Sequence, residues 1–359
     1  MRPGLDSVIA AETILSHVDG EAGRLIVRGH DLEDLAGSAS YEQAVALLWT
    51  DFVPMAADIA RLRTELGAAR VKAFNRFAPL KPNLSGLTAT EGMRLLLSSV
   101  PDGNDEQEPV DVLAAAGVAA AFATRATANL APVAPDASSP HAADIFRMIR
   151  GKPGDAEEVK AFETYLVTII DHGLNASTFT ARVVASTAAR LPSAIVAALC
   201  ALKGPLHGGA PGPVLDMLDA IGTPGNADAW IADALKRGER LMGFGHRVYR
   251  VRDPRANVLK TTVAKFKGRA NRIALAEAVE AAALRALRDF KSERRLDTNV
   301  EFYTALLLEA LDIPREGFTP VFGAGRAAGW IAHAREQEQT GRLIRPQSRY
   351  VGPLPVKAA

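Results

Sequence analysis

Apolar residues recur at helical spacing along most of the chain. Residues 41–49 form an amphipathic pattern directly after Ser40, a residue type that caps helix N-termini well. The same spacing predicts further helices over residues 157–170, 176–190, 193–203, 228–236, 271–290 and 302–311. Alternating strand and helix units are absent, so the pattern favours a mainly α fold over a doubly wound α/β sheet.

One stretch near the N-terminus predicts a small β-hairpin. Within residues 13–29, two short apolar segments flank Asp19-Gly20, and an Asp-Gly pair between such segments is a typical hairpin turn. Two stretches rich in proline and polar residues, 101–109 and 131–140, are predicted to be loops. A length of 359 residues suggests two domains, or one large domain with a smaller appendage.

Composition and charge exclude several classes of protein. The chain is 48% hydrophobic and 23% charged, which is ordinary for a protein with a large core and excludes disordered and collagen-like classes. The net charge of +1 lacks the basic excess of a typical nucleic-acid binder. The longest apolar run, residues 112–123, is too short to span a membrane. The single cysteine, Cys200, and the lack of an apparent signal peptide predict a cytoplasmic protein.

Three histidines lie in glycine-containing segments that interrupt the helical pattern. They are His172 in Asp171-His-Gly, His207 in Gly204-Pro-Leu-His-Gly-Gly and His246 in Gly243-Phe-Gly-His. Because glycine permits unusual backbone angles and close approach of a ligand, these breaks indicate a binding or catalytic site. For any one of these histidines alone, a structural role is the alternative. The other four are predicted to be structural or exposed: His17, His30, His141 and His333.

Arginine is dense just after His246. Four arginines lie within nine positions, namely Arg247, Arg250, Arg252 and Arg255, and two more, Arg326 and Arg345, lie in segments shaped by glycine or proline. Arginine is the preferred side chain for bidentate recognition of carboxylates and phosphates, so an anionic ligand is favoured over a merely solvated basic face. Glu301 lies in the first turn of a predicted helix, where a carboxylate is commonly only a helix-terminal charge.

Two other kinds of site match the sequence less well. Residues 323–328 formally match G-x-G-x-x-A, the phosphate-binding turn of dinucleotide-binding folds, but the rest of a parallel βαβ unit is missing. A metal site could use His172, His207, His246 and Glu301 as ligands. Short ligand spacings such as H-x-x-x-H are missing among them, so we expect no metal.

Taken in order, the motifs resemble those of the citrate synthase family. The signature segments are Gly204-Pro-Leu-His207-Gly-Gly, Gly243-Phe-Gly-His246-Arg-Val-Tyr, Asp253-Pro-Arg255 and Asn299-Val-Glu-Phe-Tyr303. Further matches are Ala11-Glu12-Thr13, Asp19-Gly20 with Arg28-Gly29, and residues 175–179 and 326–332. The resemblance covers about residues 5–50 and 141–350 and is weak between about 53 and 140.

The resemblance implies an almost wholly helical, two-domain homodimer with its active site in the cleft between the domains. By position, the large domain would comprise residues 1–210 and 313–359, and the small domain residues 211–312. Closure of this cleft would bring His207, His246 and Glu301 together and exclude water. No metal or redox cofactor is implied, because the coenzyme A thioester is a substrate.

The family reaction condenses acetyl-CoA with oxaloacetate and hydrolyses the product thioester to citrate and CoA. The resemblance assigns the general base to Glu301, the hydrogen bond to the thioester carbonyl to His207, and polarisation of the oxaloacetate keto group to His246. Residues matching the oxaloacetate site are His172, Arg255, Arg326, Phe322 and Arg345, the last contributed to the partner subunit's site. Arg250 and Lys260 match contacts to CoA.

Glu301 departs from the family pattern, in which the base is ordinarily aspartate. The extra methylene group lengthens the side chain by about 1.5 Å, whereas the reference pKa stays similar. Gly173, where many relatives have glutamate, is a smaller departure. Besides citrate synthase, the open alternatives are a 2-methylcitrate synthase using propionyl-CoA, another acyl-CoA condensation, and a weakly active paralogue that binds CoA or dicarboxylates.

Overall fold

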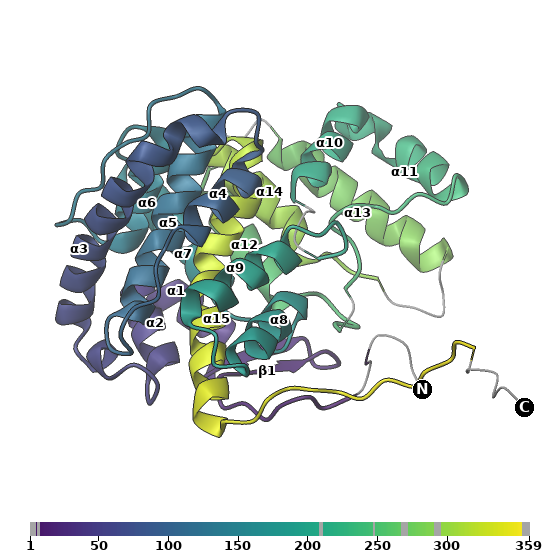
Figure 1. Ribbon diagram of the computed structural model, residues 1–359. Helices are drawn as coiled ribbons and strands as arrows, with labels where there is room; N and C mark the ends of the chain where they lie inside the picture. Colours follow the sequence, from purple (N-terminus) through teal and green to yellow (C-terminus); the bar gives the residue numbers. More distant parts are fainter. Residues whose placement is uncertain are drawn as a thin grey trace, which may run out of the picture.

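The computed structural model describes residues 5, 8–207, 211–246, 248–266, 272–290 and 296–353. These residues are mostly helical, which confirms the prediction of a mainly α fold (Figure 1). The α-helices are α1 (Leu32–Ser38), α2 (Tyr41–Trp49), α3 (Ile59–Phe77), α4 (Ala89–Ser98), α5 (Glu108–Thr127), α6 (His141–Arg150), α7 (Ala156–Thr168), α8 (Ala176–Ala185), α9 (Leu191–Leu202), α10 (Pro211–Ile221), α11 (Ala227–Lys236), α12 (Pro254–Val263), α13 (Ile273–Phe290), α14 (Val300–Ala310) and α15 (Phe318–Thr340). Short 3-10 helices cover Pro54–Ala57, Ala78–Leu84, Pro224–Asn226, Ala264–Phe266 and Arg315–Gly317.

The predicted N-terminal hairpin is confirmed and carries one additional strand. Strands β1 (Ser16–Asp19) and β2 (Arg24–Val27) pair antiparallel, and the short β3 (His30–Asp31) pairs with β2. The Asp19 carboxylate accepts hydrogen bonds from the main-chain N–H groups of Glu21 and Ala22, at 3.1 and 2.9 Å. This Asx-type contact stabilises the turn that the Asp-Gly pair predicted.

Local capping signals explain where helices begin and end. Ser40 caps α2 as predicted, and its hydroxyl accepts the Gln43 N–H at 3.2 Å. The predicted helix 176–190 ends early, at Ala185, because Ala188 adopts a left-handed backbone with a φ of 61°. Pro192 lies in the first turn of α9, so this helix starts before the predicted residue 193. Helix α5 was not predicted; it has Pro109 in its first turn and begins within the predicted loop 101–109.

Helix α5 forms the centre of the core. It packs against α3, α4, α6 and α15, and its alanine-rich surface lets those helices approach closely. It is also long and apolar enough to cross a membrane, and no other helix in the described ranges meets that test. Since 78% of its apolar window is buried by neighbouring helices, its composition reflects a core position.

Helices α10, α11 and α13 stand side by side at one end of the molecule (Figure 1). Helix α11 packs on α13, and α10 packs on α13 and α14. Helix α12 packs on α14 and also contacts α1 and α7, which lie outside the set formed by α10, α11 and α13. Helix α12, which carries Arg255, thus lies between α14, which carries Glu301, and α1 with α7.

Candidate functional site

Glycines place the loop of His246 directly against the start of α14. Gly243 and Gly245 have φ values of 84° and 85°, and a Cβ on Gly243 would lie 2.8 Å from the Cβ of Phe302. Main-chain hydrogen bonds join Gly245 N to Asp297 O at 2.7 Å and Asn299 N to Gly243 O at 3.0 Å. Only glycine allows this approach, which brings His246 next to the segment of Glu301.

The tautomer of His246 is set by the main chain. Its Nδ1 accepts hydrogen bonds from the N–H groups of Val248 and Tyr249, both at 3.1 Å. Burial, assisted by the charge of Arg255, lowers the pKa of His246 to about 4. A neutral ring that accepts at Nδ1 carries its proton on Nε2, so this histidine can donate from Nε2.

His207 is held in the opposite tautomer. Its Nε2 lies 3.3 Å from the main-chain N of Ser177, which donates to it, and 2.8 Å from the Ser177 hydroxyl. Burial, with the charges of Arg326 and Arg255, lowers the pKa of His207 to about 4. The proton of this neutral imidazole is therefore on Nδ1, which can donate to a ligand.

His172 lies in the loop between α7 and α8. Gly173 follows it with a φ of 55°, and Asn175 caps α8 by accepting the N–H groups of Ser177 and Thr178, each at 3.1 Å. The His172 and His246 rings are 5.4 Å apart. Burial, and next the charge of Arg255, lowers the pKa of His172 well below its usual value, so the ring is neutral.

Two buried arginines supply positive charge to the histidine cluster, which consists of His172, His207 and His246. Arg255 is 3% exposed and binds Asp253 through two hydrogen bonds, Nε to Oδ1 at 3.0 Å and Nη2 to Oδ2 at 2.8 Å. Arg326 is 1% exposed, donates from Nε to the Ile169 carbonyl, and lies 4.9 Å from the centre of the Phe322 ring. Its Nη2 is buried and has no hydrogen-bond partner among the described residues. A buried guanidinium with an unused donor is suited to an anionic oxygen.

Glu301 is half-buried and contributes a carboxylate with the properties of a base. It lies in the first turn of α14, where Asn299 accepts its main-chain N–H at 3.0 Å. Its Oε2 is buried, and the described part of the chain offers it no hydrogen bond. Burial raises the pKa of Glu301 to about 7, although Arg255 opposes the rise. A carboxylate of this pKa can take up a proton near neutral pH.

The glycines of residues 323–328 serve helix packing rather than a nucleotide. The segment lies inside α15, so the dinucleotide-binding alternative is wrong, because that motif needs a turn between strand and helix. A Cβ on Gly325 would lie 2.7 Å from Ile169 Cδ1, and one on Gly329 only 2.3 Å from the Ile170 carbonyl oxygen. These glycines let α15 press Arg326 against the residues preceding His172. In the described ranges, no three His, Cys, Asp or Glu side chains are grouped to hold a metal.

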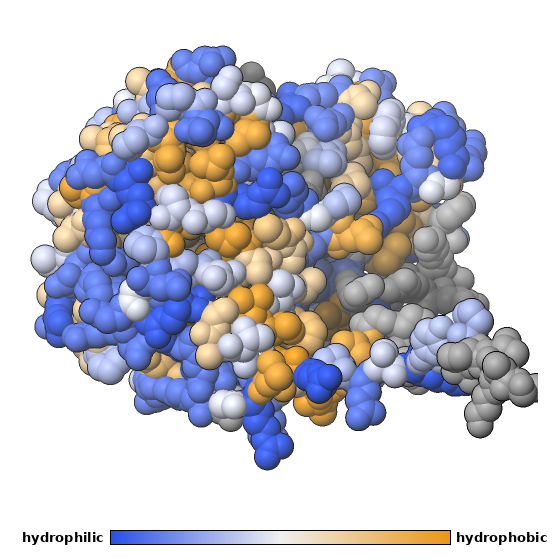
Figure 2. Space-filling view, in the orientation of Figure 1, coloured by the Kyte–Doolittle hydropathy of each residue, from blue (hydrophilic) through white to orange (hydrophobic). Residues whose placement is uncertain are grey.

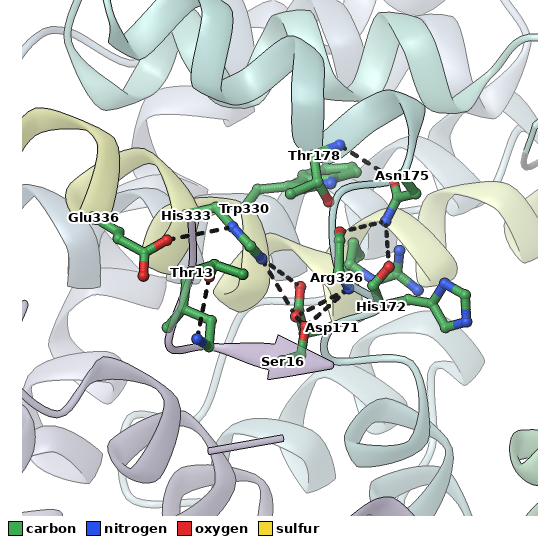
Figure 3. A network of polar contacts seen from close by, with 12 residues as sticks. Thr13, Ser16, Asp171, His172, Asn175, Thr178, Arg326, Trp330, His333 and Glu336 are labelled. Atoms are coloured by element: carbon green, nitrogen blue, oxygen red, sulfur yellow. Dashed lines mark hydrogen bonds and ion pairs between the residues drawn. The ribbon is translucent and has the colours of Figure 1, made fainter. Parts of the chain in front are cut away.

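A buried polar network fixes the loop of His172 (Figure 3). Asp171 accepts from the Ser16 hydroxyl on β1, and that same hydroxyl accepts the Gly173 N–H at 2.9 Å. His333 on α15 is fully buried, with Nε2 3.4 Å from Asp171 Oδ2 and Nδ1 3.0 Å from Arg182 Nη1. His333 therefore donates to Asp171 from Nε2 and supports the neighbour of His172.

The tip of the hairpin contacts the segment that follows His246. The Gly20 carbonyl accepts the Arg250 N–H at 2.9 Å, and a Cβ on Gly20 would lie 2.4 Å from the Val248 carbonyl oxygen. The hairpin therefore touches the segments of both His172 and His246, at Asp171 through β1 and at Val248 through its turn. The sequence marked Asp19-Gly20 as a turn and as a match to the family pattern, but nothing local indicates what the turn packs on.

The residues expected to bind CoA or to reach the partner subunit's site lie outside the group of His172, His207 and His246. Arg345 is exposed on the segment after α15, where the neighbouring Ile344 N–H binds Ser186, and it does not join the cluster of its own chain. Arg250 is exposed. Lys260 pairs with Glu280 at 2.8 Å and lies 5.6 Å from the centre of the Tyr303 ring. Arg247 lies outside the described residues.

Comparisons with known proteins extend the similarity over the whole chain. A family model described as "Citrate synthase, C-terminal domain" matches residues 4–347. The citrate synthase of Haloferax volcanii is 36% identical over 372 residues, covering 98% of this chain and 96% of that protein. The solved citrate synthase of Thermotoga maritima has a TM-score of 0.85 at 30% identity, covering 100% of this chain and 98% of that one. The Thermoplasma acidophilum citrate synthase, solved in ternary complex with carboxymethyl coenzyme A and oxaloacetate, has a TM-score of 0.87 at 28% identity and covers 99% and 97%.

Proposed function

Since this chain belongs to the citrate synthase family, we propose that it condenses acetyl-CoA with oxaloacetate and hydrolyses the resulting thioester to citrate and CoA. The observation that carries the proposal is the combination of one basic carboxylate with two neutral imidazoles. Glu301 has a pKa raised to about 7, while His207 and His246 have pKa values lowered to about 4. At neutral pH the site thus offers a base and two N–H donors that carry no charge.

Each group then has a defined step. The Glu301 carboxylate takes a proton from the thioester methyl group, while His207 Nδ1–H donates to the thioester carbonyl oxygen on which charge develops. The enol carbon attacks the keto carbon of oxaloacetate. His246 Nε2–H donates its proton to the keto oxygen, which becomes the hydroxyl group of citrate. The proton that Glu301 took from the methyl group balances this transfer, because Glu301 releases it to solvent and the imidazole takes one up. Water then cleaves the thioester and releases CoA as a free thiol.

The two carboxylates of oxaloacetate require cationic partners. We assign them to Arg255 and Arg326, with His172 and Phe322 completing the pocket. The buried Nη2 of Arg326, which makes no hydrogen bond within the described ranges, supports this assignment. Arg345 would reach the partner subunit's site, and Arg250 and Lys260 would contact CoA on closure of the proposed domains 1–210 with 313–359 and 211–312.

A homodimer is part of the proposal. Hydrophobic residues gather over α8 and α9 on the face seen in Figure 2. Val184 on α8 and Val196 on α9 are only partly buried in the single chain. A second copy of the chain would cover this surface, and exchange of Arg345 would make each site depend on association. We place the enzyme in the cytoplasm, in keeping with its single unpaired cysteine.

Free-thiol release by the purified protein tests the function. Oxaloacetate-dependent release that is faster from acetyl-CoA than from propionyl-CoA is the expected result. A preference for propionyl-CoA would instead identify a 2-methylcitrate synthase. Both thioesters must be compared directly, because a pocket discriminates one methylene group by only about 1–3 kcal/mol. Oxaloacetate binding without thiol release from either thioester would instead favour a weakly active paralogue.

The pH dependence of kcat/KM should report the state of Glu301. Its raised pKa means that the carboxyl group becomes protonated, and inactive as a base, below about pH 7 rather than below its usual value of 4.5. We expect kcat/KM for acetyl-CoA to fall about tenfold per pH unit on this acid side. Circular dichroism at each pH controls for unfolding, and an acid limb near pH 4.5 would contradict the assignment.

A further inference from the structure

Tyr249 contacts both of the histidines that flank the proposed oxaloacetate pocket. Its hydroxyl oxygen lies 3.2 Å from His172 Nε2, and its main-chain N–H donates to His246 Nδ1 at 3.1 Å. Its ring centre lies 4.8 Å from that of His246 and 5.6 Å from that of His172. One residue thus sets contacts to two imidazoles that are themselves 5.4 Å apart.

The contact to His172 joins segments that are distant along the chain. Tyr249 and His172 are separated by 77 positions, and they belong to the two parts of the chain assigned above to the small and large domains. Tyr249 is 2% exposed, and the adjacent Arg250 N–H is anchored on the Gly20 carbonyl. The Tyr249 side chain therefore has little conformational freedom, and its hydroxyl group can restrain the His172 ring, which belongs to the other of these two parts of the chain.

A histidine side chain needs such a restraint because its χ2 torsion angle has a broad distribution. The ring of a histidine rotates about its Cβ–Cγ bond with only a weak preference, so one polar contact decides where each nitrogen points. Burial raises the pKa of Tyr249, and the hydroxyl therefore stays protonated throughout the neutral range. It can donate to His172 and still accept a hydrogen bond from a ligand or a neighbour.

We propose that Tyr249 is a positioning residue for oxaloacetate, orienting His172 through its hydroxyl group and His246 through its main-chain N–H. This inference rests on the proposed function and adds a residue that the sequence motifs placed beside the site without a role. Through His172, the Tyr249 hydroxyl group affects the binding of oxaloacetate, not that of the thioester. Its loss should weaken oxaloacetate binding and leave the handling of the thioester nearly unchanged.

The variant Tyr249→Phe tests the proposal, because it removes the hydroxyl and keeps the ring and the main-chain N–H. We expect the oxaloacetate Kd from calorimetry and the oxaloacetate KM to rise about tenfold. The KM for acetyl-CoA should stay within about twofold of the wild type. In protein labelled with ¹⁵N-histidine, the imidazole signal lost in His172→Asn should also shift in Tyr249→Phe.

Tyr41→Phe is a matched control. Tyr41 is also buried and stacks on a histidine, His141, at 5.5 Å, and its hydroxyl has no hydrogen-bond partner among the described residues. That variant should match the wild type in every measurement. Wild-type protein that binds no oxaloacetate would overturn both the proposed function and this inference. Wild-type binding with an equal Kd in Tyr249→Phe, or an equal rise of both KM values, would overturn only the role of Tyr249.

Discussion

Replacing Glu301 by glutamine should lower thiol release from acetyl-CoA by about 10²- to 10⁴-fold, the contribution that a positioned general base makes. Glutamine has nearly the shape of glutamate but cannot take up a proton. Binding of oxaloacetate, measured by calorimetry without thioester, should stay close to that of the wild type, because Arg255 and Arg326 remain. Residual turnover near the wild-type level would remove Glu301 from the mechanism.

Stability separates loss of the base from loss of the fold. A carboxyl group whose pKa is raised on folding favours the unfolded state above its ordinary pKa of 4.5, where the unfolded chain is ionised. Glu301→Gln should therefore be at least as stable as the wild type at pH 8 in thermal unfolding. Glu42→Gln is the matched control, since Glu42 is 4% exposed, accepts the His141 N–H at 2.8 Å and lies outside the cluster. An amide oxygen can replace that acceptor, so its turnover should be unchanged.

Glu301→Asp asks whether the backbone is set for the longer side chain. Aspartate keeps a carboxylate but places it about 1.5 Å closer to the backbone. A misplacement of about 1 Å can lower the rate around 10²-fold. We expect a rate of thiol release between those of the wild type and Glu301→Gln. An aspartate variant faster than the wild type would mean that the glutamate lowers the rate of acetyl-CoA condensation in this chain, and propionyl-CoA should then be compared again.

Arg70→Met should lower the free energy of unfolding by about 3–5 kcal/mol, because it leaves a buried carboxylate short of its partner. Arg70 and Asp144 are both fully buried and joined at 2.8 Å, and Arg70 Nη2 also donates to the carbonyls of Asp136 and Ser139 at 2.9 and 2.8 Å. Arg147 still binds Asp144 Oδ1 at 2.6 Å, which favours the lower end of this range.

Urea denaturation at pH 7 measures this effect, with Arg24→Met as the control. Arg24 pairs with Asp31 at 2.9 Å in a similar geometry, but the two side chains are 56% and 40% exposed. An exposed pair of this kind contributes little, so its removal should leave the denaturation midpoint nearly unchanged. Equal losses in the two variants would contradict the dependence on burial.

Features encoded by adjacent residues could be predicted from the sequence. The hairpin follows from Asp19-Gly20, the start of α2 from Ser40, and the three histidine loops from their glycines. The end of α8 could not be predicted, since alanine at position 188 gives no sign of a left-handed backbone. Tertiary packing imposes that conformation on a residue whose own preference is helical.

The remaining parts of the site depend on residues far apart in the chain. Asp171 binds Ser16 and His333, which are 155 and 162 positions away, and no local pattern links these three. The function of Tyr249 was equally hidden, because an aromatic residue three positions after His246 has no distinguishing signature. The sequence predicted a structural or exposed position for His333, and the structure confirms a structural one, fully buried and bound to Asp171 beside His172.

The contacts between the two ends of the chain bear on the order in which the protein can be made. Ile14 N–H donates to Glu336 on α15 at 2.9 Å across 322 positions, and the Trp49 indole donates to Ala328 across 279. Contacts of such sequence separation raise contact order and slow folding. A ribosome adds α15 after α1 to α14, so the hairpin and α2 lack these partners until α15 has been synthesised. We therefore expect nascent chains that end before residue 318 to be protease-sensitive and to depend on chaperones until the final helix emerges.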